Sequence, residues 1–110
     1  MSLINAGMVR NDTVIPSGRL TYSKISNIIN SPLIVKKVTG AVLFQILEYA
    51  VSQYPGFAGQ FPCVSGLRFE FDPTATPRVR KVIVNKEPLD IHREYTITTT
   101  SFQGRGGDGF

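Results

Sequence analysis

Apolar residues follow a helical period in the middle of the chain. Between Gly40 and Gln53 they form one stripe at spacings of three and four: Val42, Leu43, Ile46, Leu47, Ala50 and Val51. Thr39 stands at the N-cap position, and Tyr54-Pro55-Gly56 supplies a stop signal. We therefore expect a helix over 40–53 that packs this stripe into a core.

A shorter apolar pattern predicts a second helix ahead of it. Ile25, Ile28 and Ile29 lie at helical spacing, and Thr21 or Ser23 can cap the helix. Ser31-Pro32 then breaks the pattern, because the residue before a proline is disfavoured in helical conformation.

Four segments favour strands. In 33–38 we expect Leu33, Val35 and Val38 to point inward, and in 67–71 the alternation places Leu67, Phe69 and Phe71 on one face. The segments 79–84 and 95–100 are also rich in β-branched residues, and a tight turn is expected at 85–88. Two main helices with four or five strands predict an α+β domain with a mostly antiparallel or mixed sheet.

Composition narrows the functional classes. The chain has 110 residues, of which 42% are hydrophobic, so one domain with a core is expected. The net charge of +4 is spread along the chain, which suits a small anion better than a nucleic acid. Cys63 and His92 are the only Cys and His, too few for a zinc cluster, and Cys63 is expected to be a small core residue.

The segment "SFQGRGGDGF", residues 101–110, is the first candidate for binding chemistry. Phe102 offers a ring for stacking, Arg105 a cation, and Asp108 an acceptor for hydroxyl groups, which together suit a nucleoside. The alternative is a glycine-rich turn whose Asp caps a following helix, and composition alone does not separate the two. The pattern lacks the GK[ST] ending of a phosphate loop.

A second candidate loop, "INAGMVR", lies near the start of the sequence. Asn5 can both donate and accept hydrogen bonds, and Arg10 can clamp a phosphate or carboxylate with two parallel bonds. From spacing alone, an Asn turn followed by a surface Arg is the leading interpretation.

Several segments, taken in order, resemble one known family. They cover nearly the whole chain from Ile4 to Phe110 and read "INAGMVR", "IPSGRLTYSKISNII", "VKKVTGAVLFQILEYAVS", "FPCVSGLRFEFDP", "VNKEPLDIHREYTITTTSF" and "GGDGF". The series is similar to the C-terminal domain of the 5'-nucleotidase family, which includes ecto-5'-nucleotidases and periplasmic UDP-sugar hydrolases.

The resemblance implies a division of labour between two domains. In the family, an N-terminal metallophosphoesterase domain holds two divalent metal ions, and the C-terminal domain binds the nucleoside and rotates to present the phosphate. Residues 1–110 are then expected to be one C-terminal-type domain, truncated on its N-terminal side, without the metallophosphoesterase domain and with no cofactor of its own. Such a fragment would bind nucleotide without hydrolysing it, and its partner would be the metal domain of the same parent.

The resemblance also implies further properties of the parent. The helix and strand that precede the first loop in the family are not in this chain, so an exposed sheet edge is expected, which would favour a dimer. Family members are commonly secreted, periplasmic or held at the cell surface.

The family's binding residues transfer by position. Asn5 and Arg10 match its Asn-Gly-Gly-x-x-Arg segment, so Asn5 would touch the base and Arg10 the ribose or phosphate. Phe102 would stack on the base and Asp108 would take the ribose hydroxyls. Gly66, in the pair Ser65-Gly66, would line the pocket.

The sequence departs from the family pattern in three places. Ala6 replaces a glycine, an upstream Arg is missing, and the stretch Ile29 to Val35 carries no counterpart of the family's second stacking Phe. In the family two aromatic rings hold the base between them. With only one ring, base recognition is expected to be weaker or broader, because stacking on a ring contributes about 1–3 kcal/mol per base. The alternatives are therefore a degenerate, non-catalytic binding module, or the same enzyme class acting on UDP-sugars or cyclic nucleotides.

Overall fold

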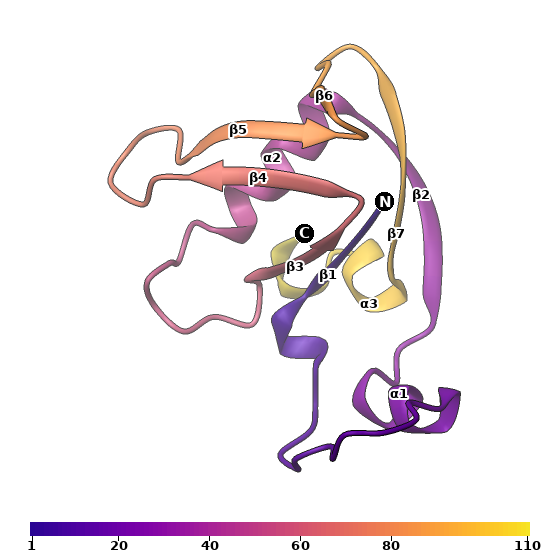
Figure 1. The fold of residues 1–110 in the computed structure, drawn as a ribbon. Coiled ribbons are helices and arrows are strands. Elements are labelled where there is room, and N and C mark those ends of the chain that lie inside the picture. Colours follow the sequence, from indigo (N-terminus) through magenta and orange to yellow (C-terminus); the bar gives the residue numbers. More distant parts are fainter.

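Two sheets and three helices make up the structure, a computed structural model that describes residues 1–110 (Figure 1). The α+β prediction is confirmed. The strands are β1 (Ser2–Asn5), β2 (Leu33–Thr39), β3 (Pro62–Ser65), β4 (Leu67–Phe71), β5 (Val79–Val84), β6 (Glu87–Pro88) and β7 (Glu94–Thr100). The helices are α1 (Tyr22–Ile28), α2 (Gly40–Ala50) and α3 (Ser101–Gly104), with 3-10 turns η1 (Ala6–Met8) and η2 (Gly107–Gly109).

The first sheet is mixed and has the strand order β2-β7-β1-β3. Its central pair, β1 and β7, is parallel, whereas β2 and β3 pair antiparallel to their neighbours. Parallel strands end at the same edge of a sheet. The residues that follow β1 and β7 are therefore brought to one edge, although they lie at opposite ends of the sequence.

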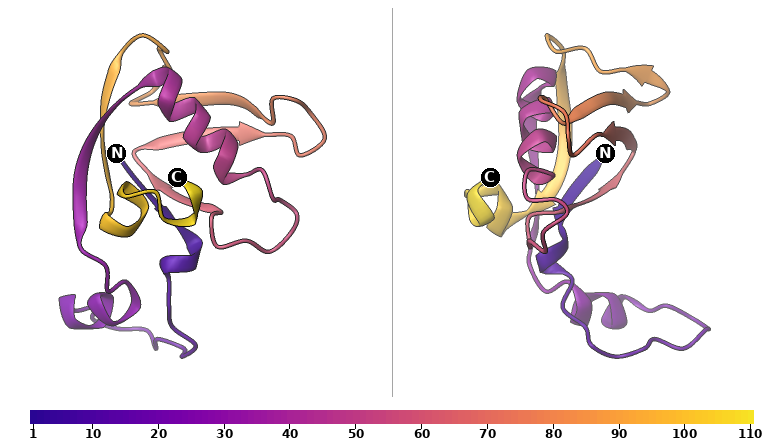
Figure 2. Two further views of the ribbon diagram at one scale, coloured as in Figure 1. Left: turned by 180° about the vertical axis from the view of Figure 1, so that it is seen from behind. Right: turned by 90° about the vertical axis from the view of Figure 1, so that its left-hand side faces the viewer.

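The second sheet has the order β4-β5-β6 and packs against α2. Leu67 is buried, and Phe69 and Phe71 on the same face are partly buried against the core, which confirms the predicted alternation. Figure 2 shows that α2 and α3 lie on one side of the first sheet, and that α1 lies apart from them below it.

Helix α2 supplies the centre of the core. Thr39 caps it by accepting a hydrogen bond from the Val42 amide, as predicted, and the helix ends three residues earlier than the expected Gln53. Most of the predicted stripe is buried or half-buried, but Val42 is exposed. The other N-cap prediction also holds, because Thr21 accepts from the Lys24 amide at the start of α1.

Glu48 of α2 fixes the start of β5. Its two carboxylate oxygens accept hydrogen bonds from the backbone amides of Arg78 and Val79, each at 2.8 Å. The Arg78 guanidinium donates in turn to the carbonyls of Val51 and Tyr54 beyond the helix end. One carboxylate thereby joins the helix to the second sheet.

Two predictions about burial are wrong. Leu33 and Val35 are 61% and 66% exposed, because β2 turns Ile34, Lys36 and Val38 toward α2 and α3 instead. The run "LIVKKV" has apolar residues at consecutive positions, so an alternation of two fits either face. Cys63, expected in the core, is exposed, since β3 buries Pro62 before it and turns Cys63 outward.

The segments predicted as loops at 4–10 and 101–110 contain regular structure. Residues 2–5 form β1, which pairs with β3 on one side and β7 on the other. Residues 101–104 form α3, which Thr100 caps by accepting from the Gln103 amide at 3.2 Å. No helix of the chain has the length and apolar character needed to cross a bilayer.

Candidate functional site

The candidate site forms where β1 and β7 end at the shared edge of the first sheet. Asn5 is the last residue of β1, and Thr100, the last of β7, leads directly into α3 and η2. Sequence-distant segments meet here because the two strands are parallel neighbours. The carboxyl ends of strands are where α/β folds place their ligands, so this edge is a favourable position for binding.

Asn5 and Asp108 form the polar centre of the site. The Asn5 side chain is only 1% exposed, and its Nδ2 donates a hydrogen bond to Oδ2 of Asp108. Asp108 is exposed. The buried amide therefore holds one carboxylate oxygen, while the remaining acceptor capacity of the carboxylate stays available at the surface.

The backbone around Asp108 is held in an unusual conformation. Asp108 has a φ of 54°, in the left-handed region that Asp tolerates better than most residues. The Tyr49 hydroxyl of α2 donates to the Asp108 carbonyl at 2.6 Å, and the Tyr49 ring meets Phe110 edge to face at 5.1 Å. A side chain on Gly109 would collide with the Tyr49 hydroxyl, because its Cβ would lie 2.2 Å away.

The alternative interpretation of this segment is that Asp108 caps a helix after Phe110. Within residues 1–110 the Asp108 carboxylate caps no helix. Asp108 lies inside η2, and the hydrogen bond of its carboxylate goes to Asn5 of β1. The carboxylate is thus held toward the sheet edge and the neighbouring loop.

Phe102 provides the aromatic surface next to Asp108. Its side chain is 45% exposed and belongs to α3, four residues before the αL glycine Gly106. The ring lies against Gly107: if Gly107 carried a side chain, its Cβ would lie 2.5 to 2.6 Å from three ring atoms. The absence of a side chain on Gly107 therefore lets the Phe102 ring pack against its backbone, and part of the ring stays exposed to solvent.

The stretch without the family's second aromatic lies beside α3. The Ser101 amide, next to Phe102, donates to the Pro32 carbonyl at 2.7 Å. No aromatic ring of the protein stacks on Phe102. The stretch 29–32 therefore contacts α3 through its backbone and supplies no second ring to the site.

A glycine-containing loop forms another wall of the site. The amides of Ala6 and Gly7 donate to the carbonyls of Phe61 and Gly59 at 2.7 and 2.8 Å. A Cβ on Gly59 would lie 3.6 Å from Oδ2 of Asp108, so this backbone borders the carboxylate. Sequence reasoning missed Gly59 and Tyr49, because neither belongs to a motif and only the fold brings them to Asp108.

Two of the predicted site residues have no contact with this group. The Arg10 amide donates to the Ile28 carbonyl at 3.0 Å, which ties this residue to the end of α1, and its exposed guanidinium makes no ion pair. Gly66 has a φ of 78° at the junction of β3 and β4 and packs on Met1, at the opposite end of β1 from Asn5. The structure thus brings together Asn5, Phe102 and Asp108 and places Gly66 at the far end of β1. Arg10 has no contact with these residues, and its exposed guanidinium has no partner within the chain.

The chain contains no group of three or more His, Cys, Asp or Glu side chains that could hold a metal ion. Its residues therefore do not fit the pair of divalent ions that the resemblance assigns to a neighbouring domain. The chemistry available at the site is stacking by one ring and hydrogen bonding by one oriented carboxylate.

Comparisons with known proteins agree with this picture. The family model for "5'-nucleotidase, C-terminal domain" matches residues 1–110. The chain is 33% identical to Protein 5NUC of Lutzomyia longipalpis, over 86% of this chain and 19% of that protein. It is 28% identical to the NAD 5'-nucleotidase of Haemophilus influenzae, over 100% of this chain and 20% of that protein.

Solved structures share the fold. The 5'-nucleotidase precursor of Thermus thermophilus superposes with a TM-score of 0.84 at 35% identity, over 98% of this chain and 22% of that chain. The chain thus spans about a fifth of the length of the relatives that it matches.

Proposed function

Because this chain belongs to the family of 5'-nucleotidase C-terminal domains, we propose that it is the substrate-binding part of an enzyme that hydrolyses nucleotides. The observation that carries the proposal is the convergence of Phe102, Asp108 and Asn5 at the shared edge of β1 and β7. Phe102 takes one face of the base by stacking, and the Asp108 carboxylate accepts hydrogen bonds from the ribose hydroxyls.

Asn5 acts mainly through Asp108 in this proposal. An amide that is 1% exposed has little surface to offer a base, but it fixes the carboxylate to which it donates. Orienting the carboxylate in advance lowers the entropy lost on binding. Arg10, whose guanidinium is free and exposed, is the residue we assign to the phosphate side of the ligand.

The single ring supports a broad base preference. A ligand stacks on Phe102 from one side, and the chain has no second ring to cover its other face. Stacking depends little on base identity, because every base has a π-face. We therefore expect purine and pyrimidine nucleosides to bind with similar affinity.

Hydrolysis is assigned to another part of the parent protein. The chain spans about a fifth of its relatives and offers no set of metal ligands. Residues 1–110 alone should release no phosphate from AMP with added divalent metal. Metal-dependent phosphate release by this chain, unaffected by further purification, would contradict the assignment.

Relatives named as snake venom 5'-nucleotidases support an exported parent. Secretion with venom is a property of those proteins. For this protein the test is fractionation of source cells with an antibody against residues 1–110, in which a purely cytosolic parent would overturn the assignment.

The experiment that tests the proposal is a titration of 15N-labelled chain with adenosine, uridine and AMP. Amide shifts should cluster at residues 5–10 and 101–110, and those of Arg10 should be larger with AMP than with adenosine. A folded sample that shows no shifts with any of the three ligands would reject a nucleoside site in this chain and favour the degenerate binding module.

A further inference from the structure

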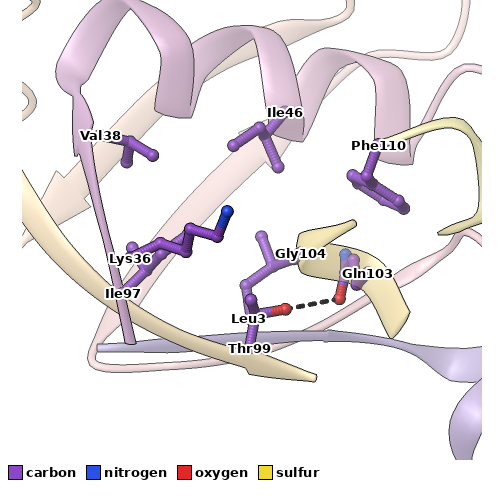
Figure 3. Close-up of a pocket in the computed structure, with 9 residues that line it drawn as sticks. All are labelled: Leu3, Lys36, Val38, Ile46, Ile97, Thr99, Gln103, Gly104 and Phe110. Atoms are coloured by element: carbon purple, nitrogen blue, oxygen red, sulfur yellow. Dashed lines mark hydrogen bonds between the residues drawn. The ribbon is translucent and has the colours of Figure 1, made fainter. Parts of the chain in front are cut away.

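A cavity lies between α2 and the face of the first sheet, beside α3. Its volume is about 150 Å³, and none of Asn5, Phe102 and Asp108 lines it. The walls are mostly apolar and come from β1, β2, α2, β7 and α3, with Leu3 and Ile97 on the sheet, Ile46 on α2 and the Phe110 ring at one side (Figure 3).

Two hydrogen-bond donors interrupt the apolar lining. Gln103 is 4% exposed, and its Oε1 accepts a hydrogen bond from the Thr99 hydroxyl at 2.8 Å. Its Nε2 has no hydrogen-bond partner. A buried donor without a partner destabilises the protein, so this amide gains from a ligand that accepts a hydrogen bond.

The second donor is the Lys36 ammonium. Figure 3 shows the side chain extending from β2 toward the middle of the cavity. Lys36 forms no ion pair, whereas its neighbour Lys37, on the other face of β2, lies 3.9 Å from Glu94. No Asp or Glu lines the cavity. The site therefore presents one positive charge and one amide donor with no acidic group beside them.

The size and lining of the cavity define the ligand. An apolar cavity of about 150 Å³ can hold a benzene-sized ring, and the two donors suit a carboxylate group. We propose that this cavity binds a small monocarboxylate with a compact aromatic or branched apolar body. The carboxylate pairs with Lys36 and Gln103, and the apolar body fills the space between Leu3, Ile46 and Ile97.

The proposal is tested with benzoate as the probe and benzyl alcohol as its uncharged match. In a titration of 15N-labelled chain, benzoate should shift the signals of the lining residues and bind at least about tenfold more tightly than benzyl alcohol, since a hydrogen bond to a charged group is worth about that factor or more. Equal binding of the two probes, or no shifts with benzoate, would overturn the proposal.

Two substitutions separate the charge from the lining. Lys36→Met keeps the apolar stem and should weaken benzoate about tenfold, whereas Lys37→Met, the same change on the opposite face, should leave it unchanged. Gln103→Glu replaces the amide donor with an acceptor and should remove benzoate binding. Because it changes a buried residue, its fold is checked by its amide spectrum and by retained binding of benzyl alcohol. Equal affinities for the Lys36 and Lys37 variants would contradict the assignment.

Discussion

The buried amide of Asn5 donates a hydrogen bond to the carboxylate of Asp108 across 103 positions of sequence. The bond joins the last residue of β1 to the segment that follows β7. It exists because these two strands pair in parallel and end at the same edge. The pair determines how the carboxylate is presented to a ligand, which makes it the first target for mutation.

Asp108→Asn should weaken the binding of adenosine by about tenfold. The substitution removes the charge that strengthens hydrogen bonds from the ribose hydroxyls, and such bonds are worth about 1.5–3 kcal/mol. The affinity for 2',3'-dideoxyadenosine, which lacks those hydroxyls, should be unchanged. Isothermal titration with both nucleosides provides the measurement. An equal loss of affinity for the two nucleosides would show that Asp108 maintains the loop conformation and does not bind the ribose hydroxyls.

Asn5→Ala should lower ribose selectivity without changing the charge of the site. The Asp108 carboxylate would lose its buried donor and sample more orientations, so adenosine affinity should fall less than in Asp108→Asn. In the double variant the two losses should not add, because both act on one interaction. Strict additivity would show that Asn5 contacts the ligand independently, as the family resemblance implies.

Phe102→Ala should reduce the affinity for adenosine and uridine by about tenfold each. The ring contributes stacking, which is worth about 1–3 kcal/mol per base and differs little between bases. Phe102→Leu retains apolar contact and should show an intermediate loss. Phe57→Ala serves as the control, since Phe57 is fully exposed in the loop after α2. Unchanged affinity in Phe102→Ala would remove the ring from the site.

Tyr49→Phe should destabilise the fold by about 1 kcal/mol, which is the typical worth of one hydrogen bond. The lost bond joins α2 to the Asp108 carbonyl, so nucleoside affinity should fall together with stability. Tyr54→Phe is the matched control, because the Tyr54 hydroxyl forms no hydrogen bond within the chain. Urea unfolding compares the stability of the two variants. Equal unfolding midpoints would show that the Tyr49 hydrogen bond does not stabilise the fold.

Glu48→Ala should be the most destabilising of these changes, by about 2–3 kcal/mol. It leaves the backbone amides of Arg78 and Val79 without their charged acceptor at the start of β5. Glu48→Gln keeps one acceptor oxygen and should cost about half as much. Nucleoside affinity should be unchanged in both, since Glu48 lies outside the site. A Gln variant as unstable as the Ala variant would attribute the effect to charge alone.

The longer elements could be predicted from sequence because local signals agree with tertiary structure there. The caps at Thr21 and Thr39 and the alternation in β4 are all found. In β2, by contrast, neighbouring apolar residues fit either face, and the choice depends on the packing of Ile34 against Gly104 of α3. The inward face of that strand was therefore not determined by its own residues.

The short elements carry too few residues for a periodic signal. β1 and β3 have four residues each, and α3 has four residues and ends in a glycine. Their structure comes from tertiary contacts: β1 is paired on both sides, and α3 is anchored by the Pro32 carbonyl. Asn5, Phe102 and Asp108 could be proposed from their chemistry and from the family resemblance, but the supporting roles of Tyr49 and Gly59 could not, because no local pattern connects them to Asp108.

The parallel pairing of β1 with β7 also links ligand binding to the unfolding of the whole domain. Breaking that pair separates Asn5 from Asp108 and abolishes the proposed site, so a nucleoside that binds there would bind only the folded chain. Mass action then requires saturating nucleoside to raise the free energy of unfolding, by about 2.7 kcal/mol at a hundred times Kd. A thermal melt with and without ligand therefore measures affinity, and a carboxylate bound behind α3 should add a second, independent increment.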